Sequence, residues 1–401
     1  MKVITQTKTF QLLGILICLL FYNTSIQAQT TAIPDTTFEQ RLIALGIDSD
    51  GLVNGQILNS DAAGVQVLDL TQRNIRDLTG LSAFVALEEL EVDNNYLTQI
   101  DLTANTLLEK VNVNNTQLTT LDLSSNTALV ELSCTNNSLT TLNLSSNTNL
   151  EILYCAVNQL TSLDVSNNLL LRTLGCQYNQ ISSLNVSNNT GLVNLYCKDN
   201  QLTSLDVSNM LFLVNLDCMD NQLTSLNVLN TPALEDLGCI NNQITSLNIS
   251  NSPLLTVLHC FNNQINSVLF PNSTALIDLQ MGTNLLTSID IAHCSNIHTV
   301  NVSNNFLPSI DVSNNPTLFN LDIKNNAISS IDLSNNIALY IFTGSGNSLT
   351  VLDLSNNPNL NTLYANRNLL GLLRLPNTNL SKMYCNNNMG YLQVCVDDVI
   401  A

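Results

Sequence analysis

Seven cysteines recur at intervals of 21 residues, and a row of thiols is a candidate for metal or redox chemistry. They are Cys134, Cys155, Cys176, Cys197, Cys218, Cys239 and Cys260. Zinc needs ligands that converge on a tetrahedron, whereas one thiol per repeat gives a row, which also suits the dihedral angle of a disulfide badly. Met281, Val302 and Ile323 continue the column, so we predict buried, reduced thiols that pack as small hydrophobic side chains. Cys385 and Cys395 stand outside the column, and the sequence does not decide whether they form a disulfide.

A second column of the same period carries carboxylates and amides. Its members are Asp101, Asp122, Asn143, Asp164, Asn185, Asp206, Asn227, Asn248, Leu269, Asp290, Asp311, Asp332 and Asp353. Neighbouring carboxylates on a sheet repel each other, so they need counterions, raised pKa values or hydroxyl donors. The candidate donors are Ser303, Ser313, Ser334 and Ser355. Divalent cations bound along the row are the functional interpretation, but we favour a solvated acidic face.

The segment Asp48-Ser49-Asp50-Gly51-Leu52-Val53-Asn54-Gly55 resembles a calcium loop, in which alternating oxygens converge on a hard cation. Leu52 stands where a ligand belongs, and the glutamate at the twelfth position is missing. We therefore favour a polar turn, and we keep Asp48, Asp50 and Asn54 as the candidate ligands of a calcium ion. The sequence predicts no other cofactor.

Residues for catalysis do not come together in the sequence. The three histidines, His259, His293 and His298, fall in unrelated columns. The sequence has no nucleophile elbow, phosphate-binding loop or metal-ligand cluster. We therefore predict that the protein is not an enzyme.

The columns follow from one repeated phrase. Leu192-x-x-Leu195-x-Cys197-x-x-Asn200 is followed by a second half that starts at Leu202, and together they span 21 residues. In the Asn200 column, which runs from residue 95 to residue 368, thirteen of fourteen positions are asparagine, and Thr116 is the exception. This period and phrase are the signature of a leucine-rich-repeat solenoid, here with about sixteen coils.

The phrase also predicts the geometry of a coil. Leu195 and Cys197 alternate, so they share one face of an extended segment, and we expect that face to point inward. One coil cannot enclose a core, so each buries its apolar rows against its neighbours. The asparagine amide can bond to backbone groups of its own turn and of the adjacent coil. Because the second half copies the first, we expect extended segments on both long sides, parallel strands and little or no helix.

Outward positions on the first strand are free of this packing role, so they are candidates for binding. Tyr154, Tyr196 and His259 lie in one outward row, and the next row carries Lys198, Met219, Ile240 and Phe261 in consecutive coils. Aromatic residues make up only 5% of the chain, so the gathering stands out. Exposed apolar residues in neighbouring coils favour a contact site. The alternative is the ordinary scatter of apolar residues on a protein surface.

Residues 1–28 read as a secretory signal peptide. Lys2 and Lys8 precede an apolar run over residues 12–22, and Ala28 offers a cleavage site. The run is too short to span a bilayer, and we predict no membrane insertion. Cleavage would leave ten basic residues against 31 acidic ones. Such a charge argues against binding to nucleic acid or to anionic membranes.

Residues 29–64 lack the repeat and are predicted to form an N-terminal cap. Thr36-x-x-Glu39 reads as a capping box, Phe38, Leu42 and Leu45 recur at helical spacing, and Gly46 ends the run. A short helix here would shield the first coil from water. The solenoid is then expected over residues 65–395, and residues 396–401 form the C-terminal end.

The repeats resemble the 21-residue class of leucine-rich repeats in secreted bacterial proteins, distantly of the internalin type. The resemblance covers residues 34–399 and includes the opening Ile33-Pro34-Asp35-x-x-Phe38 and the closing phrase over residues 392–398. It implies secretion, a solenoid fold and binding as the default role. Members often continue into a C-terminal sorting domain, so the chain is either a fragment or a member without that domain.

Two hypotheses for function follow. The first is an exported recognition scaffold, either secreted or on the extracellular side of the outer membrane, that binds a protein or a surface polysaccharide. The second is a rigid, acidic adhesive rod of the cell envelope, with calcium as an added stabiliser. The sequence leaves the ligand and the oligomeric state open.

Overall fold

The computed structural model describes residues 29–376 and 380–396. The predicted signal peptide lies outside these residues, as do residues 397–401 of the predicted C-terminal end. In the described part, no helix has both the length and the apolar character that a bilayer crossing requires.

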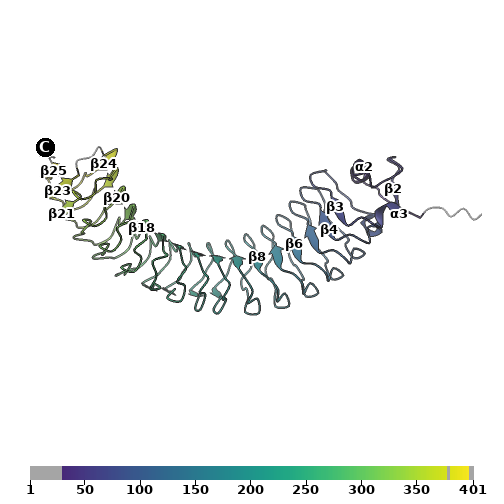
Figure 1. Cartoon of the computed structure of the whole chain (residues 1–401), viewed down its shortest axis with the longest axis horizontal. Coiled ribbons are helices and arrows are strands. Elements are labelled where there is room, and N and C mark those ends of the chain that lie inside the picture. Colours follow the sequence, from purple (N-terminus) through teal and green to yellow (C-terminus); the bar gives the residue numbers. More distant parts are fainter. Residues whose placement is uncertain (1–28, 377–379, 397–401) are drawn as a thin grey trace, which may run out of the picture.

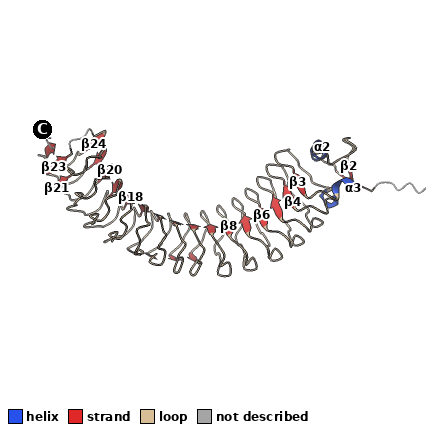
Figure 2. Ribbon diagram, viewed as in Figure 1, coloured by secondary structure: helices blue, strands red, loops and turns tan. Residues whose placement is uncertain are grey.

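The coils stack into an arc whose concave side carries one long parallel sheet (Figures 1 and 2). Each coil adds one strand to it, which confirms the predicted solenoid of about sixteen coils. The sixteen strands are β3 (Val67–Asp69), β4 (Glu89–Glu91), β5 (Lys110–Asn112), β6 (Glu131–Ser133), β7 (Ile152–Tyr154), β8 (Thr173–Gly175), β9 (Asn194–Tyr196), β11 (Asn215–Asp217), β13 (Asp236–Gly238), β15 (Val257–His259), β17 (Asp278–Gln280), β18 (Thr299–Asn301), β19 (Asn320–Asp322), β20 (Ile341–Thr343), β22 (Thr362–Tyr364) and β24 (Lys382–Tyr384).

Paired strands on the second long side form in only some of the coils. The described strands of the second side are β10 (Ser204–Asp206), β12 (Ser225–Asn227), β14 (Ser246–Asn248), β16 (Ser267–Leu269), β21 (Val351–Asp353), β23 (Leu372–Leu375) and β25 (Gln393–Val396). They pair as β10–β12, β14–β16 and β21–β23–β25. The arc spreads the coils apart on this convex side (Figure 1), which opposes a continuous ladder of backbone hydrogen bonds.

Buried asparagines bridge the convex side where strands are missing. In Asn189, for example, Nδ2 donates to the carbonyls of Val165 (3.0 Å) and Asn168 (2.8 Å) in the preceding coil. The same position is held by Asn105, Asn126, Asn147, Asn168, Asn315, Asn336 and Asn357, all fully buried. Met210, Thr231 and Ser252 replace the asparagine in the turns that follow β10, β12 and β14. The strands β10, β12 and β14 therefore lie in coils that lack this amide bridge, whereas β21 is followed by the bridging Asn357.

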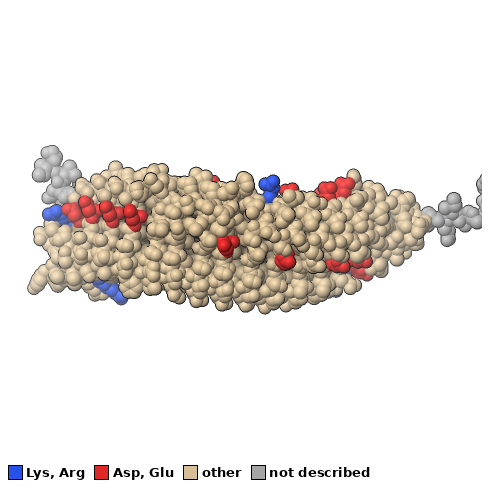
Figure 3. All heavy atoms as spheres, turned by 90° about the horizontal axis from the view of Figure 1, so that it is seen from below, with Lys and Arg blue, Asp and Glu red and all other residues tan. Residues whose placement is uncertain are grey.

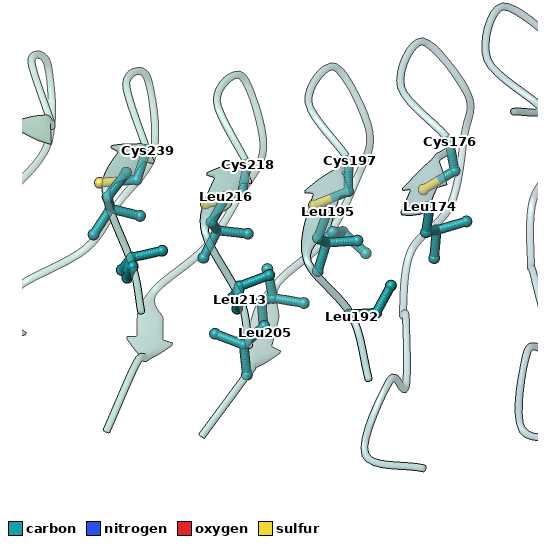
Figure 4. Close-up of a cluster of buried hydrophobic side chains, with 14 of the residues drawn as sticks. Leu174, Cys176, Leu192, Leu195, Cys197, Leu205, Leu213, Leu216, Cys218 and Cys239 are labelled. Atoms are coloured by element: carbon teal, nitrogen blue, oxygen red, sulfur yellow. The ribbon is translucent and has the colours of Figure 1, made fainter. Parts of the chain in front are cut away.

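The core lies between the two sides of the arc and confirms the inward assignment. Leu195 and Cys197 are fully buried, and Leu205 on the opposite side is 3% exposed. Figure 4 shows the leucine and cysteine side chains of successive coils stacked in rows inside the solenoid. Each row is therefore buried by contact with the coils on either side.

The asparagine ladder, defined as the column that contains Asn200, joins successive coils as predicted. Asn200 Nδ2 donates to the carbonyls of Cys176 (3.0 Å) and Cys197 (3.1 Å). Its Oδ1 accepts the backbone N–H of Ile181 at 3.0 Å. One side chain thus pairs backbone groups of two coils that would otherwise be buried without partners.

The residue before most ladder asparagines adopts a left-handed conformation, which is unfavourable for branched side chains. Asn136 has φ 56° and suits the position, whereas Val157 has φ 53°. We expect Val157→Asn to raise the free energy of unfolding by about 0.5–1 kcal/mol, because Asn tolerates this conformation. Urea denaturation measures the change, with Asn136→Val as the matched control that should lose stability. Equal midpoints for the three proteins would contradict the backbone argument.

The N-terminal cap contains a helix, as predicted, but its start is different. β1 (Thr30–Ala32) pairs antiparallel with β2 (Gln56–Leu58), and α2 (Thr36–Ala44) and α3 (Asn59–Ala62) complete the cap. The 3-10 helix η1 (Leu81–Ala83) lies in the first coil, between β3 and β4. Asp35 caps α2, because its Oδ1 accepts the N–H groups of Thr37 (2.8 Å) and Phe38 (3.1 Å). The predicted capping box is therefore wrong, since the aspartate one residue earlier reaches the free N–H groups first.

Glu39, the second half of that predicted box, has another role. It is fully buried, and its Oε1 accepts the backbone N–H groups of Asn54, Gly55 and Gln56 at 2.7–3.1 Å. The glutamate therefore closes the loop that follows the helix.

Candidate functional site

The structure places the first outward row on the concave sheet. Tyr154, Tyr196 and His259 are the last residues of β7, β9 and β15. The strand register aligns them in one column, whose intervening members are Gly175, Asp217 and Gly238. Large and small side chains thus mix along the row.

The second outward row lies beside the first but is less exposed than predicted. Lys198, Met219, Ile240 and Phe261 are all half-buried. Met219 lies over Gly238, where a Cβ atom would collide with its Cε, and Phe261 lies over Gly282 in the same way. Because glycines leave room in the neighbouring coil, these apolar side chains fold down onto the sheet instead of projecting from it.

Three of the predicted residues meet in one hollow. The concave hollow has a volume of about 270 Å³, and it is lined by Tyr196, Asn215, Leu216, Asp217, Met219, Asp236, Gly238 and His259. Tyr154, Lys198, Ile240 and Phe261 do not line it. Tyr154 packs instead against Gly175, and the Lys198 Nζ lies 5.2 Å from the centre of the Tyr178 ring.

The sequence reasoning missed Asp217, Asp236 and Gly238. A signal for them was present, because Asp217 and Gly238 occupy the same outward column as Tyr196 and His259. Asp236 stands two residues before Gly238 on β13, and so on the same face of the sheet. The hollow forms because Gly238 adds no side chain between Asp217 and His259.

The two carboxylates of the hollow are unfavourably placed for their charge. Burial raises the pKa of Asp217, and the nearby acids Asp236 and Asp220 add to the rise. Two contacts oppose it: the Asp217 Oδ1 accepts the Met219 N–H at 3.2 Å, and Lys198 lies nearby. Burial also raises the pKa of Asp236, with His259 opposing and Asp278 adding to the rise. His259 Nε2 lies 3.0 Å from Asp278 Oδ2. The hollow therefore holds two carboxylates whose ionised forms are disfavoured by burial.

Because burial raises the pKa of Asp217, we predict that Asp217→Asn does not destabilise the protein at neutral pH. A carboxyl whose pKa is higher in the folded state than the ordinary 3.8 opposes folding once it is ionised, and the penalty disappears below pH 3.8. Asparagine can still accept the Met219 N–H. We expect the melting temperature of the variant to exceed that of the parent at pH 7 and to match it in acid. Thermal melts from pH 3 to pH 8 test this, and a variant that melts lower at pH 7 would refute it.

The cysteine column is buried, as predicted. All seven thiols are free and fully buried, and burial raises the pKa of Cys134 and of Cys176 to about 12. Figure 4 shows sulfur atoms of successive coils in a row inside the solenoid. Cys385 and Cys395, for which a disulfide was left open, are also free.

We expect the seven column thiols to resist a bulky thiol reagent in the native protein. The thiolate is the reactive form. Burial blocks access to all seven thiols, and at Cys134 and Cys176 the raised pKa also suppresses the thiolate. Mass spectrometry after labelling, with and without denaturant, measures this. Rapid labelling of the folded chain at these positions would show that the column is not buried.

The acidic column caps turns on the convex side. In Asp206, Oδ1 accepts the Ser208 N–H at 2.9 Å, and the same bond recurs along the column. Hydrogen bonds from the residue two positions later lower the pKa of these aspartates. The hydroxyl of that residue has the larger effect at Asp101, Asp164, Asp311 and Asp353. Its backbone N–H has the larger effect at Asp122, Asp206 and Asp332.

Two details of the acidic column differ from the prediction. Ser303 does not serve it, because its hydroxyl donates to Asn301, and Asp290 instead accepts the Ala292 N–H. The predicted alternative of raised pKa values is also wrong for the seven aspartates whose pKa is lowered. Figure 3 shows acidic side chains in a row at the C-terminal end of the convex face.

The segment from Asp48 to Gly55 is a loop held both by its own side chains and by its surroundings. The Ser49 N–H donates to Asp61, and the N–H groups of Asn54 and Gly55 donate to Glu39. Asp50 accepts the Leu52 N–H and the Asn54 amide, both at 2.7 Å. Asp48 is 4% exposed, and burial raises its pKa. Within residues 29–376 and 380–396, no group of three or more His, Cys, Asp or Glu side chains is arranged to hold a metal ion. Calcium binding by Asp48, Asp50 and Asn54 stays a prediction.

Known proteins resemble the chain in structure. No protein-family profile and no curated protein matches it. The functional domain of InlJ from Listeria monocytogenes, which includes a cysteine ladder, is 29% identical with a TM-score of 0.68, over 83% of this chain and 79% of that one. A leucine-rich-repeat protein of Leptospira interrogans is 23% identical with a TM-score of 0.64, over 84% of this chain and 86% of that one.

A plant protein shares the fold as well. The leucine-rich-repeat ectodomain of the receptor kinase GASSHO1/SCHENGEN3 from Arabidopsis thaliana is 21% identical with a TM-score of 0.56, over 82% of this chain and 51% of that one. The bacterial neighbours, the 21-residue period and the parallel sheet of one strand per coil agree with each other. The chain is a leucine-rich-repeat solenoid of the 21-residue type, similar to those of bacterial proteins.

Proposed function

We propose that the chain is an exported, non-catalytic recognition scaffold that binds a protein or a surface glycan through its concave sheet. The concave hollow carries this proposal, because it gathers Tyr196, Met219 and His259 on a face whose outward side chains the repeat does not need for packing. The fold is used for recognition elsewhere, since the Arabidopsis ectodomain is solved in complex with CASPARIAN STRIP INTEGRITY FACTOR 2. Export is supported by the signal-peptide pattern of residues 1–28.

The alternative, an acidic rod stabilised by calcium, finds less support. The acidic column would have to supply free oxygens for cations, but one oxygen of each of Asp206, Asp311 and Asp332 already accepts a backbone N–H. Turn capping accounts for these carboxylates without a metal.

An array of surface proteins and glycans, probed with the chain and with a Tyr196→Ala/Phe261→Ala variant, tests the proposal. The matched control is Tyr96→Ala/Phe306→Ala, which removes two aromatic rings that are 46% and 61% exposed and directly follow ladder asparagines. We expect the first variant to lose the signal and the control to keep it. Binding that survives in the first variant but disappears with a chelator would instead favour the calcium-dependent rod.

A further inference from the structure

We infer that the concave hollow binds a basic side chain, lysine or arginine, of a protein partner. The inference rests on the proposed function and names the chemistry of its ligand. Eight residues line the hollow, and they include the carboxylates of Asp217 and Asp236 and no lysine or arginine. Asp217 ends β11, and Asp236 begins the adjacent strand β13, so two carboxylates on neighbouring strands border one cavity.

The surroundings of these carboxylates favour a cation. Burial raises the pKa of both carboxylates. A neighbouring acid adds to each rise, Asp236 at Asp217 and Asp278 at Asp236, while Lys198 and His259 oppose the two rises without cancelling them. Burial and the neighbouring acids both penalise the ionised form, and the attraction of a bound cation offsets that penalty. Lys198 does not fill the hollow, because its Nζ lies over the Tyr178 ring and 3.8 Å from the Asp199 carboxylate.

The size and walls of the hollow suit one side chain. Its volume of about 270 Å³ lies just below the range of roughly 300–1,000 Å³ that encloses drug-sized ligands. Tyr196 supplies an aromatic wall, to which a guanidinium or ammonium group is attracted. Met219 supplies an apolar surface for the methylene stem of the same side chain. A planar guanidinium can also bond to a carboxylate through two N–H groups, so we expect arginine to bind more tightly than lysine.

Specific binding must be separated from general attraction, because the whole chain has a formal net charge of −19. The test uses the full chain and fluorescence anisotropy with a labelled tetra-arginine peptide at about 0.15 M salt, where exposed charges more than about 8 Å apart are largely screened. A tetra-citrulline peptide is the neutral probe of the same shape. Maltohexaose serves as the competitor that represents a neutral glycan.

The test variant is Asp217→Asn/Asp236→Asn, and the matched control is Asp311→Asn/Asp332→Asn, which makes the same charge change on the convex side. Asparagine keeps the shape of each side chain, and thermal melts verify that both variants fold. We expect the test variant to bind the arginine peptide about tenfold or more weakly than the parent chain, which corresponds to about 1.4 kcal/mol. The control variant should lose less than about twofold in affinity. Citrulline should bind at least tenfold more weakly than arginine to the parent chain.

Three outcomes would overturn the inference. If the test and control variants lose the same affinity for the arginine peptide, the binding is due to general charge attraction and not to the hollow. Equal binding of arginine and citrulline, or displacement of the peptide by maltohexaose, would assign the hollow to neutral ligands. In the last two cases the proposed function would stand if the array ligand still depends on Tyr196 and Phe261, so the two failures are distinguishable.

Discussion

Leu205→Asp is expected to lower the free energy of unfolding by several kcal/mol, whereas Asp206→Ala, one residue further on, should cost less than about 1 kcal/mol. Leu205 is 3% exposed on β10 and pairs with Leu226 of the next coil. A carboxylate there would be buried among leucine rows without a partner. Asp206 faces solvent, and alanine there removes hydrogen bonds from Ser208 and from the Asn227 side chain.

Urea denaturation and limited proteolysis measure this pair. Contacts in a solenoid are between neighbouring coils, so damage in a central coil should open the chain near residue 205 while the flanking coils stay protected. If the two variants unfold alike, or if Asp206→Ala is the worse, then the inward and outward assignment is inverted, and the concave hollow loses its basis.

The second large effect is expected in the asparagine ladder. Asn200→Ala removes the donors to the Cys176 and Cys197 carbonyls and leaves the Ile181 N–H without its acceptor. Unpaired buried groups cost about 1–3 kcal/mol each, and partial relaxation limits the sum, so we expect a loss of about 2–4 kcal/mol. The cost is larger than that of an ordinary surface change, because the side chain serves two coils.

Asn200→Thr is the matched control for the ladder. Thr116 shows how threonine is accommodated, since its Oγ1 donates to the Val113 carbonyl at 3.0 Å and so retains one of the ladder's bonds. We therefore expect a smaller loss for threonine than for alanine. Hydrogen exchange at the Ile181 N–H should quicken in both variants, and unchanged exchange together with unchanged stability would mean that the ladder does not join the coils.

The 21-residue period was sufficient to predict the coils, the parallel sheet and the burial of residues such as Leu195 and Cys197. Alternation along a strand determines which side chains point inward, and a fixed period aligns them between coils. The convex side was harder, because its strands depend on how far the curvature separates the coils and on whether Asn189 or a residue such as Met210 occupies the bridging position. Sequence spacing does not encode that separation.

The candidate site was predictable only in part. Tyr196, Met219 and His259 were identified as outward residues, but the cavity they share was not. It depends on Met219 folding over Gly238 and on that glycine leaving space between Asp217 and His259. Such side-chain conformations follow from three-dimensional packing. The start of α2 was mispredicted for a similar reason, because Asp35 and Thr36 are both good capping residues and only the backbone path decides between them.

The central claim, recognition through the concave sheet, is tested most directly by hydroxyl-radical footprinting of the chain with and without a ligand captured on the array. Tyr196, Met219 and His259 carry readily oxidised side chains, and Phe306, which is 61% exposed, serves as the reference away from the concave hollow. We predict that the ligand lowers oxidation of the three hollow residues several-fold and leaves Phe306 unchanged. Protection of Phe306 with no change at Tyr196, Met219 and His259 would contradict the claim.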